Sequence, residues 1–379
     1  MPRNFLLVKI LLLAYFATAH AYADNFLLAT FNNGEQKLRV LDSSDAESFA
    51  GYDRGVAYSP PPPNNLRDPS IIHHKGRYYV CHTTGDFGAA PHFSIIVSDD
   101  LRTWAHLTNV PMTGVAGIQR TWAPEWFRDS DGSLHILVSA TTAADMSDKH
   151  VIYSLAALET NQMTSWSAPT PVTGTAFGWT GTEGRRVGAY DPYVVKRGSA
   201  YYMFYFNAFT DYIELASASA LTGPYTRIRT NNWQGIGLYK EGASVIYLGG
   251  GRWRMFFADQ IYSFLSYIDS TNDWQNWTPP HRVSLPGAPT NFTVNHGTVI
   301  IPPGGLDLGI TLTAQTQGIF NLRFQATAGD FYRLLSSTNL ISWNPAELIG
   351  PTTNGPSSQL IEAGAASKQF WRLERVQPD

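Results

Sequence analysis

Four stretches of the sequence repeat one pattern. A short polar or proline-containing turn leads into an apolar strand, a turn at glycine, and a second strand rich in aromatic residues; the stretches begin at Asp68, Ala123, Asp191 and Gly242. Each is followed by a third strand and by a fourth stretch with Trp or Tyr near its start. Four strands per unit make the blade of a β-propeller, whereas a β-sandwich has no reason to repeat this pattern at near-regular intervals.

A fifth unit is split between two distant parts of the chain. The runs FLLATF and LRVLDS, shortly after residue 24, resemble the second and third strands of a unit that lacks its first strand. The run NHGTVII at Asn295–Ile301 has the form of that missing strand. Pairing them closes the ring and leaves no unpaired sheet edge between the first and last blades. The sequence therefore predicts an all-β fold built on a five-bladed β-propeller.

The composition and the ends of the chain suggest three parts. The 379 residues include 32 Gly and 23 Pro, which favour many short strands joined by turns. Residues 1–23 combine a basic start, an apolar run and small residues, and are expected to be a cleaved secretory signal, with cleavage after Ala21 or Ala23. Residues 24–303 form the predicted propeller. Residues 304–379 lack the opening-strand pattern and are expected to form a small C-terminal β-sandwich-like module.

Charge and cysteine content exclude several classes of partner. The formal net charge is −3, and the chain has no run of Lys or Arg, so neither nucleic acid nor an anionic membrane surface is an expected partner. Cys81 is the single cysteine and lies in a strand-like run, which indicates a buried, inert thiol. We expect a secreted protein, extracellular or periplasmic, with no membrane attachment after signal cleavage and no protein partner.

Acidic residues recur at the starts of the innermost strands. These strands surround the central channel of a propeller, so their starts converge at one end; the five starts carry Asp68, Ala123, Asp191, the pair Glu241-Gly242, and His296. Glycosidic hydrolysis needs an acid for the leaving oxygen and a carboxylate that activates water or attacks the sugar. A third carboxylate raises the acid's pKa by like-charge repulsion. An Asp before Pro is by itself an ordinary turn residue, so the convergence is what points to a glycosidase.

Four short motifs carry a resemblance to a known family: RDPS at 67–70, WAPE at 122–125, YDPY at 190–193 and KEGA at 240–243. Together they resemble glycoside hydrolase family 43, five-bladed inverting glycosidases that act on arabinose- and xylose-containing polysaccharides. The resemblance implies that Asp68 is the general base, Glu241 the general acid, and Asp191 the residue that tunes and orients Glu241. One departure is Ala243, where the family commonly has proline; its loss removes a backbone constraint beside Glu241.

Three further residues are candidate substrate-binding groups. His296 resembles the fifth-blade histidine of the family, which in some members helps to hold a central calcium ion through water; the alternative is a hydrogen-bonded channel residue without metal. The resemblance implies no required cofactor. Arg67 either contacts sugar hydroxyls and the acidic cluster or forms a salt bridge at a blade edge. Trp122 is either a platform for a sugar ring or a residue packed between blades.

The expected substrate is an arabinose- or xylose-containing glycan. The run WAPEWF followed by an acidic turn is more similar to arabinofuranosidases, so release of terminal α-L-arabinofuranose is the first expectation. A β-xylosidase or endo-arabinanase is the alternative, because the choice depends on the loops at 83–91 and 173–188. A non-catalytic glycan-binding propeller is a further alternative, but such a protein would not need three converging acids. A fructan hydrolase needs an N-terminal Asn-Asp-Pro motif, which DNFLLATFNN lacks.

Overall fold

The computed structural model describes residues 26–85, 88–142, 150–174, 188–290 and 292–302, and six strands between residues 311 and 376. Residues 24–248 and 252–302 form one compact unit, and residues 303–378 belong to a second. Apart from the short 3-10 helix η1 (Tyr52–Arg54), the elements of the described residues are β-strands, which confirms the all-β class. None of these residues form a helix with the length and hydropathy that a bilayer span requires.

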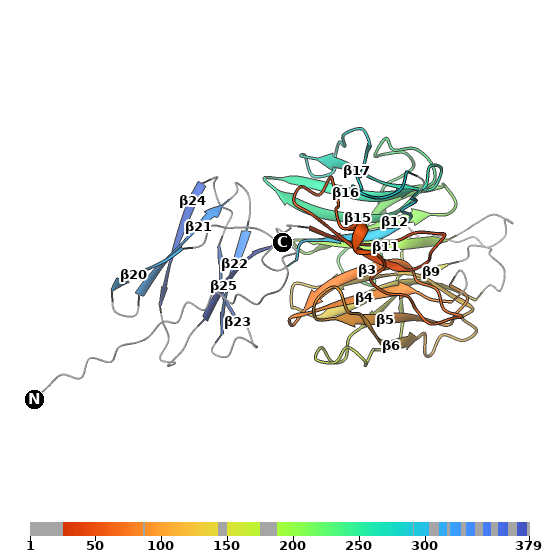
Figure 1. The fold of residues 1–379 in the computed structure, drawn as a ribbon, viewed down its shortest axis with the longest axis horizontal. Helices are drawn as coiled ribbons and strands as arrows, with labels where there is room; N and C mark the ends of the chain where they lie inside the picture. The colour runs from red at the N-terminus through yellow and green to blue at the C-terminus, as the bar shows by residue number, and fades with distance from the viewer. Residues whose placement is uncertain are drawn as a thin grey trace, which may run out of the picture. The chain divides into compact units, whose positions relative to one another are not determined.

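Four antiparallel sheets of four strands succeed one another along the chain, each with its strands in sequence order. The first blade comprises β3 (Arg67–His74), β4 (Arg77–Thr83), β5 (His92–Ser98) and β6 (Ala105–Pro111), which lie in that order in Figure 1. The second comprises β7 (Arg120–Arg128), β8 (Leu134–Thr141), β9 (Val151–Ala156) and β10 (Thr170–Pro171). The third comprises β11 (Ala189–Arg197), β12 (Ala200–Asn207), β13 (Tyr212–Ala218) and β14 (Thr226–Arg229). The fourth comprises β15 (Lys240–Gly249), β16 (Arg252–Asp259), β17 (Phe264–Ser270) and β18 (His281–Arg282).

The fifth blade closes the ring. Its sheet has the order β19-β1-β2, with β19 (Gly297–Ile300) from the end of the propeller and β1 (Phe26–Phe31) and β2 (Leu38–Ser43) from its beginning. Leu28 of β1 lies opposite Val299 of β19. The Thr30 hydroxyl also donates to the carbonyl oxygen of His296 at 2.7 Å. The predicted five-bladed propeller and its closure by the two ends of the ring are confirmed.

The first strands of the first three blades share one backbone irregularity. Asp68, Ala123 and Asp191 have φ of 46°, 45° and 54°, and the pairing register with the second strand shifts next to each of them. The next residue in each case is proline, which has no N–H to pair and therefore suits a bulge. In the fourth blade Gly242 takes the same left-handed conformation, with φ of 64°. The start of each first strand is thus bent at the same point.

Apolar side chains fill the spaces between neighbouring blades. Aromatic residues dominate several of these clusters, such as Phe204, Trp253 and Trp274 between the third and fourth blades. Cys81 belongs to the cluster between the first and second blades and is fully buried. Burial raises the pKa of its thiol, which donates to the carbonyl oxygen of Pro124 at 3.2 Å. The expected inert, buried thiol is therefore what the structure contains.

The C-terminal unit contains six strands in two three-stranded antiparallel sheets. One sheet has the order β20-β21-β24 and the other the order β23-β22-β25. The strands are β20 (Thr311–Thr316), β21 (Ile319–Ala326), β22 (Phe331–Ser337), β23 (Asn344–Ile349), β24 (Gly355–Glu362) and β25 (Phe370–Val376). The predicted signal segment 1–23 and the junction at 303–310 lie outside the described residues, so the three domain limits stay predictions.

Candidate active site

The structure brings together the ionisable residues expected at the strand starts. His296 lies between two carboxylates, with its Nδ1 3.4 Å from Asp68 Oδ1 and 3.9 Å from Asp191 Oδ2. The backbone N–H of Gly242, next to Glu241, donates to Asp191 Oδ2 at 3.0 Å. The first, third, fourth and closing blades thus each contribute to one cluster, which we call the axial cluster.

Asp68 is held in its ionised form. Burial by itself raises its pKa, but the hydrogen bond from His296, the positive charges of His296 and Arg67, and the hydrogen bond from the Thr83 hydroxyl lower the pKa below its usual value. The Thr83 Oγ1 donates to Asp68 Oδ2 at 2.8 Å. The lowered pKa favours the carboxylate form of Asp68, which is the form that a general base requires.

The pKa of Glu241 is shifted in the opposite direction, upward. Burial and the neighbouring charge of Asp191 raise its pKa to about 8, against the opposing effect of His296. Its Oε1 accepts a hydrogen bond from the side-chain amide of Gln260 in the fourth blade. Burial and the charge of Asp68 raise the pKa of Asp191 to about 6, although His296 and the N–H of Gly242 favour its ionised form. The protonated form is therefore favoured more strongly at Glu241 than at Asp191.

His296 supplies the compensating positive charge. Burial favours its neutral form, but Asp191, Asp68 and Glu241 together raise its pKa to about 9. Its ring also contacts the backbone closely, because a Cβ added at Gly242 would lie 2.7 Å from His296 Cδ2. Only glycine therefore fits beside the ring, which explains the small residue that follows Glu241.

His296 is placed as a hydrogen-bond donor in this arrangement, because its Nδ1 faces two carboxylates. Within the part of the chain that the structure describes, no three His, Cys, Asp or Glu side chains are grouped as a metal site would need. Calcium held through water stays a prediction.

Arg67 and Trp122 occupy the position just before the bulge in their blades. The guanidinium of Arg67 lowers the pKa of Asp68 and opposes the rise for Asp191 and Glu241, and it lies over the ring of Phe31 at 5.1 Å. Arg67 thus acts on the axial cluster, which is one of its two expected roles. Trp122 is partly exposed.

The ring of Trp122 is supported by neighbours. It stacks on His150 with 4.2 Å between ring centroids and meets Tyr190 edge-on at 5.7 Å. A Cβ added at Gly88 would lie 2.4 Å from its Cδ1. The indole of Trp122 thus has features of both expected roles, because it packs between blades and still has an accessible part. Its sugar-binding role stays a prediction.

Sequence reasoning missed a second layer beneath the axial cluster. Two residues after Asp68, Ala123, Asp191, Gly242 and His296, the chain carries Ser70, Glu125, Tyr193, Ser244 and Thr298. Ser70 Oγ donates to Glu125 Oε1 at 2.7 Å, and Thr298 Oγ1 donates to Glu125 Oε2 at 3.1 Å. Burial raises the pKa of Glu125 to about 8. The available signal was the acid of WAPE, two positions after Ala123.

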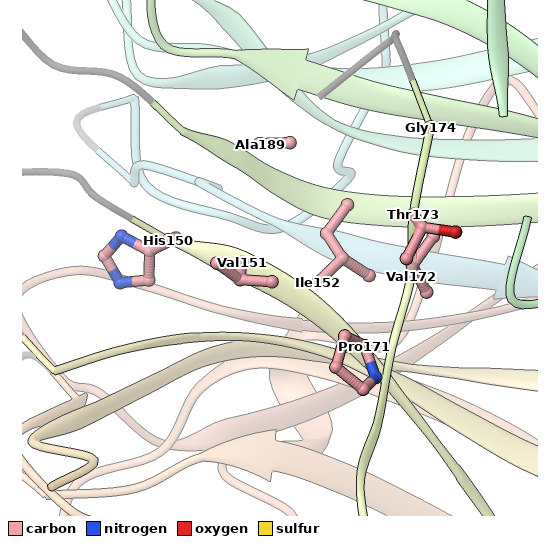
Figure 2. A pocket seen from close by; sticks show the side chains of 8 residues that line it. All are labelled: His150, Val151, Ile152, Pro171, Val172, Thr173, Gly174 and Ala189. Atoms are coloured by element: carbon pink, nitrogen blue, oxygen red, sulfur yellow. The ribbon is translucent and has the colours of Figure 1, made fainter. Parts of the chain in front are cut away.

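A separate pocket lies between the second and third blades. It is lined by His150, Val151, Ile152, Pro171, Val172, Thr173, Gly174 and Ala189, and Figure 2 shows these side chains. None of these eight described residues carries a carboxylate, and burial lowers the pKa of His150 to about 3. They therefore do not themselves supply the carboxyl groups that hydrolysis of a glycoside needs. Parts of the loops expected to choose between end and internal cleavage, at 86–87 and 175–187, lie outside the described residues.

The axial cluster combines a carboxyl group with a lowered pKa, a carboxyl group with a raised pKa, and a third acid that helps to raise the latter. These are the groups that a glycoside hydrolase needs. The family whose description is "Glycosyl hydrolases family 43" matches residues 59–184, from before the first blade into the loop after the second. This match bears out the resemblance over the part of the chain that carries the motifs RDPS and WAPE.

Several solved structures are similar to the chain, whereas no curated protein matches it. An endo-arabinase from Bacteroides thetaiotaomicron VPI-5482 has 18% identity and a TM-score of 0.49, with 73% of this chain and 89% of that chain covered. An endo-1,4-beta-xylanase from the same bacterium has 13% identity and a TM-score of 0.47, covering 74% and 94%. A beta-xylosidase/alpha-arabinofuranosidase from a compost microbial metagenome has 16% identity and a TM-score of 0.48, covering 73% and 92%.

Proposed function

We propose that the protein is a secreted, inverting glycosidase that releases terminal α-L-arabinofuranose from plant-type polysaccharides or oligosaccharides. The observation that carries the proposal is the opposite displacement of two pKa values in one cluster: that of Asp68 is lowered and that of Glu241 is raised to about 8. Two carboxyl groups with separated pKa values divide the roles of base and acid at one pH. The preference for arabinofuranose rests on the motif WAPEWF.

The proposed reaction is a single displacement. Protonated Glu241 gives its proton to the glycosidic oxygen as the bond from that oxygen to the anomeric carbon breaks. Ionised Asp68 takes a proton from a water molecule whose oxygen forms the new bond to the anomeric carbon from the opposite face. A water between base and sugar requires the two carboxyl groups to lie roughly 6.5–9.5 Å apart. The product sugar then has inverted anomeric configuration.

Asp191 and His296 prepare Glu241 and Asp68 for these roles. The negative charge of Asp191 keeps Glu241 protonated, and its hydrogen bond from Gly242 N–H fixes the backbone beside the acid. His296 binds Asp68 and balances the negative charges of the cluster. The same group is available to contact sugar hydroxyls, together with Arg67 and Trp122.

The test is a substrate panel with purified protein: 4-nitrophenyl α-L-arabinofuranoside and β-D-xyloside, arabinan, xylan and galactan. We expect arabinose release with the inverted anomer as the first-formed product in NMR spectra. Xylose release identifies a β-xylosidase, and a fall in arabinan viscosity identifies an endo-arabinanase. Binding without turnover on every substrate identifies a glycan-binding propeller, and retained configuration overturns the proposed mechanism.

A further inference from the structure

Exposed apolar side chains gather beside Glu241. Eight large apolar side chains are exposed among the described residues, and five of them lie in three short segments: Phe209, Leu238, Tyr239, Ile261 and Tyr262. We call these five residues the apolar rim. Their exposed fractions range from 40% for Leu238 to 66% for Tyr262. Apolar side chains gathered in this way on a surface mark a binding site more often than scattered ones do.

The three segments lie at the same end of the propeller as the axial cluster. Phe209 is in the turn from β12 to β13, and Ile261 and Tyr262 are in the turn from β16 to β17. In an antiparallel blade the turn between the second and third strands is at the end where the first strand begins. The segment with Leu238 and Tyr239 leads directly into β15, which carries Glu241.

Hydrogen bonds join the rim to the acid. The Tyr239 N–H donates to the carbonyl oxygen of Asp211 at 2.9 Å, and the Gln260 N–H donates to that of Tyr239 at 3.1 Å. The side chain of Gln260 then donates to Glu241. Because one residue, Gln260, connects the rim to the acid carboxyl group, the rim is continuous with the axial cluster.

Buried polar groups hold the rim in its exposed position. Asp259 forms an ion pair with Lys240 at 2.9 Å, and both side chains are less than 10% exposed. The same Asp259 accepts hydrogen bonds from the N–H groups of Ile261 at 3.0 Å and Tyr262 at 3.2 Å. Asn207 likewise accepts from the N–H of Phe209 at 3.0 Å. The rim is therefore preorganised, which lowers the entropic cost of binding a ligand.

We propose that the apolar rim binds the leaving-group side of a glycan chain, that is, the sugar rings that stay on the polymer after the terminal sugar is released. This inference rests on the proposed function, in which Glu241 protonates the oxygen that departs with the leaving group. The leaving group must then extend from Glu241, and the rim begins there. Sugar rings present apolar C–H faces that pack on exposed tyrosine and phenylalanine rings.

The experiment compares two substrates of the wild type, Tyr262→Ala, Phe209→Ala and Leu158→Ala. One substrate is the oligosaccharide or polysaccharide that the wild type cleaves best, and the other is the methyl glycoside of the released sugar, whose methanol leaving group is too small to reach the rim. Leu158 is the matched control, because it is also 66% exposed but follows the end of β9, at the opposite end of its blade.

We expect each rim variant to lower the ratio of kcat/KM for the glycan to kcat/KM for the methyl glycoside at least about fivefold, as truncation of an aromatic contact does. Leu158→Ala should keep the wild-type ratio. An unchanged ratio in both rim variants of an active enzyme overturns the assignment of the rim alone. A wild type that cleaves no glycan overturns the proposed function and this inference with it.

Discussion

The buried carboxyl group of Glu125 predicts that one isosteric substitution stabilises the protein. Glu125 is 6% exposed, and the described residues offer it only the hydroxyls of Ser70 and Thr298 as hydrogen-bond donors. Its pKa is raised from 4.5 to about 8 by burial. Glu125 therefore makes its full contribution to the stability of the folded protein at pH values below its pKa in the unfolded chain. This contribution is lost as the pH rises through its pKa in the folded protein. In Glu125→Gln an uncharged amide of the same shape takes its place.

The size of the effect follows from the two pKa values. Between pH 4.5 and pH 7 the wild type loses about 1.4 kcal/mol of stability per pH unit through this residue, or about 3 kcal/mol in total. We expect Glu125→Gln to regain this amount at pH 7, which corresponds to a rise in Tm of roughly 5–10 °C for a domain of this size. Below pH 4.5 the two proteins should melt alike. The difference in stability between Glu125→Gln and the wild type is largest above pH 8.

The assay is thermal melting followed by circular dichroism at several pH values between 4 and 9. The difference between the two melting profiles isolates Glu125, because the other titrating groups are common to both proteins. Glu214→Gln is the matched control: Glu214 is fully buried too, but it pairs with Arg227 at 3.2 Å and accepts from the Tyr205 hydroxyl at 2.9 Å. That variant should melt lower than wild type at pH 7, since it leaves a charge without its partner. A Glu125→Gln protein that melts at or below wild type at pH 7 and above would refute the reasoning.

Three further outcomes test the axial cluster. Glu241→Gln and Asp68→Asn should each lower turnover at least about 10²-fold with little change in Tm, and near wild-type turnover in both would remove the assigned roles. Asp191→Asn should move the alkaline limb of the pH–rate profile from about pH 8 to lower pH, because the charge that favours protonated Glu241 is lost; a limb that stays in place while Tm falls would make Asp191 a structural turn residue. Gly242→Ala should displace His296, whose Cδ2 would lie 2.7 Å from the new Cβ, and lower both Tm and turnover, and a variant with wild-type values in melting and activity assays would contradict the close packing.

The repeat made most of the propeller predictable. Strand order, the hairpin turns and the pairing of the two ends follow from a local pattern that recurs, and the structure confirms them. The convergence of Asp68, Asp191, Glu241 and His296 was also predictable, because equivalent positions in a ring face one axis. The repeated bulge was partly predictable from the sequence, because proline follows Asp68, Ala123 and Asp191.

The roles of Glu125 and of the apolar rim were not predictable in the same way. Glu125 matters because hydroxyls from the first and closing blades reach it, and those contacts join residues 55 and 173 positions apart. The rim exists because three turns are bonded together by backbone groups, which the residue types do not reveal. Both features depend on distances between blades, whereas a repeat specifies the blade itself.

The pairing of β1 with β19 also determines when the ring can close. Because Leu28 needs Val299 as its partner, about 270 residues must be synthesised after β1 before its sheet is complete. Until then the apolar side chains of β1 and its free backbone groups form an open edge, which invites pairing with another chain. A chain that ends between β18 and residue 297 therefore has four complete blades and one open sheet edge, so β19 is the strand that completes the ring.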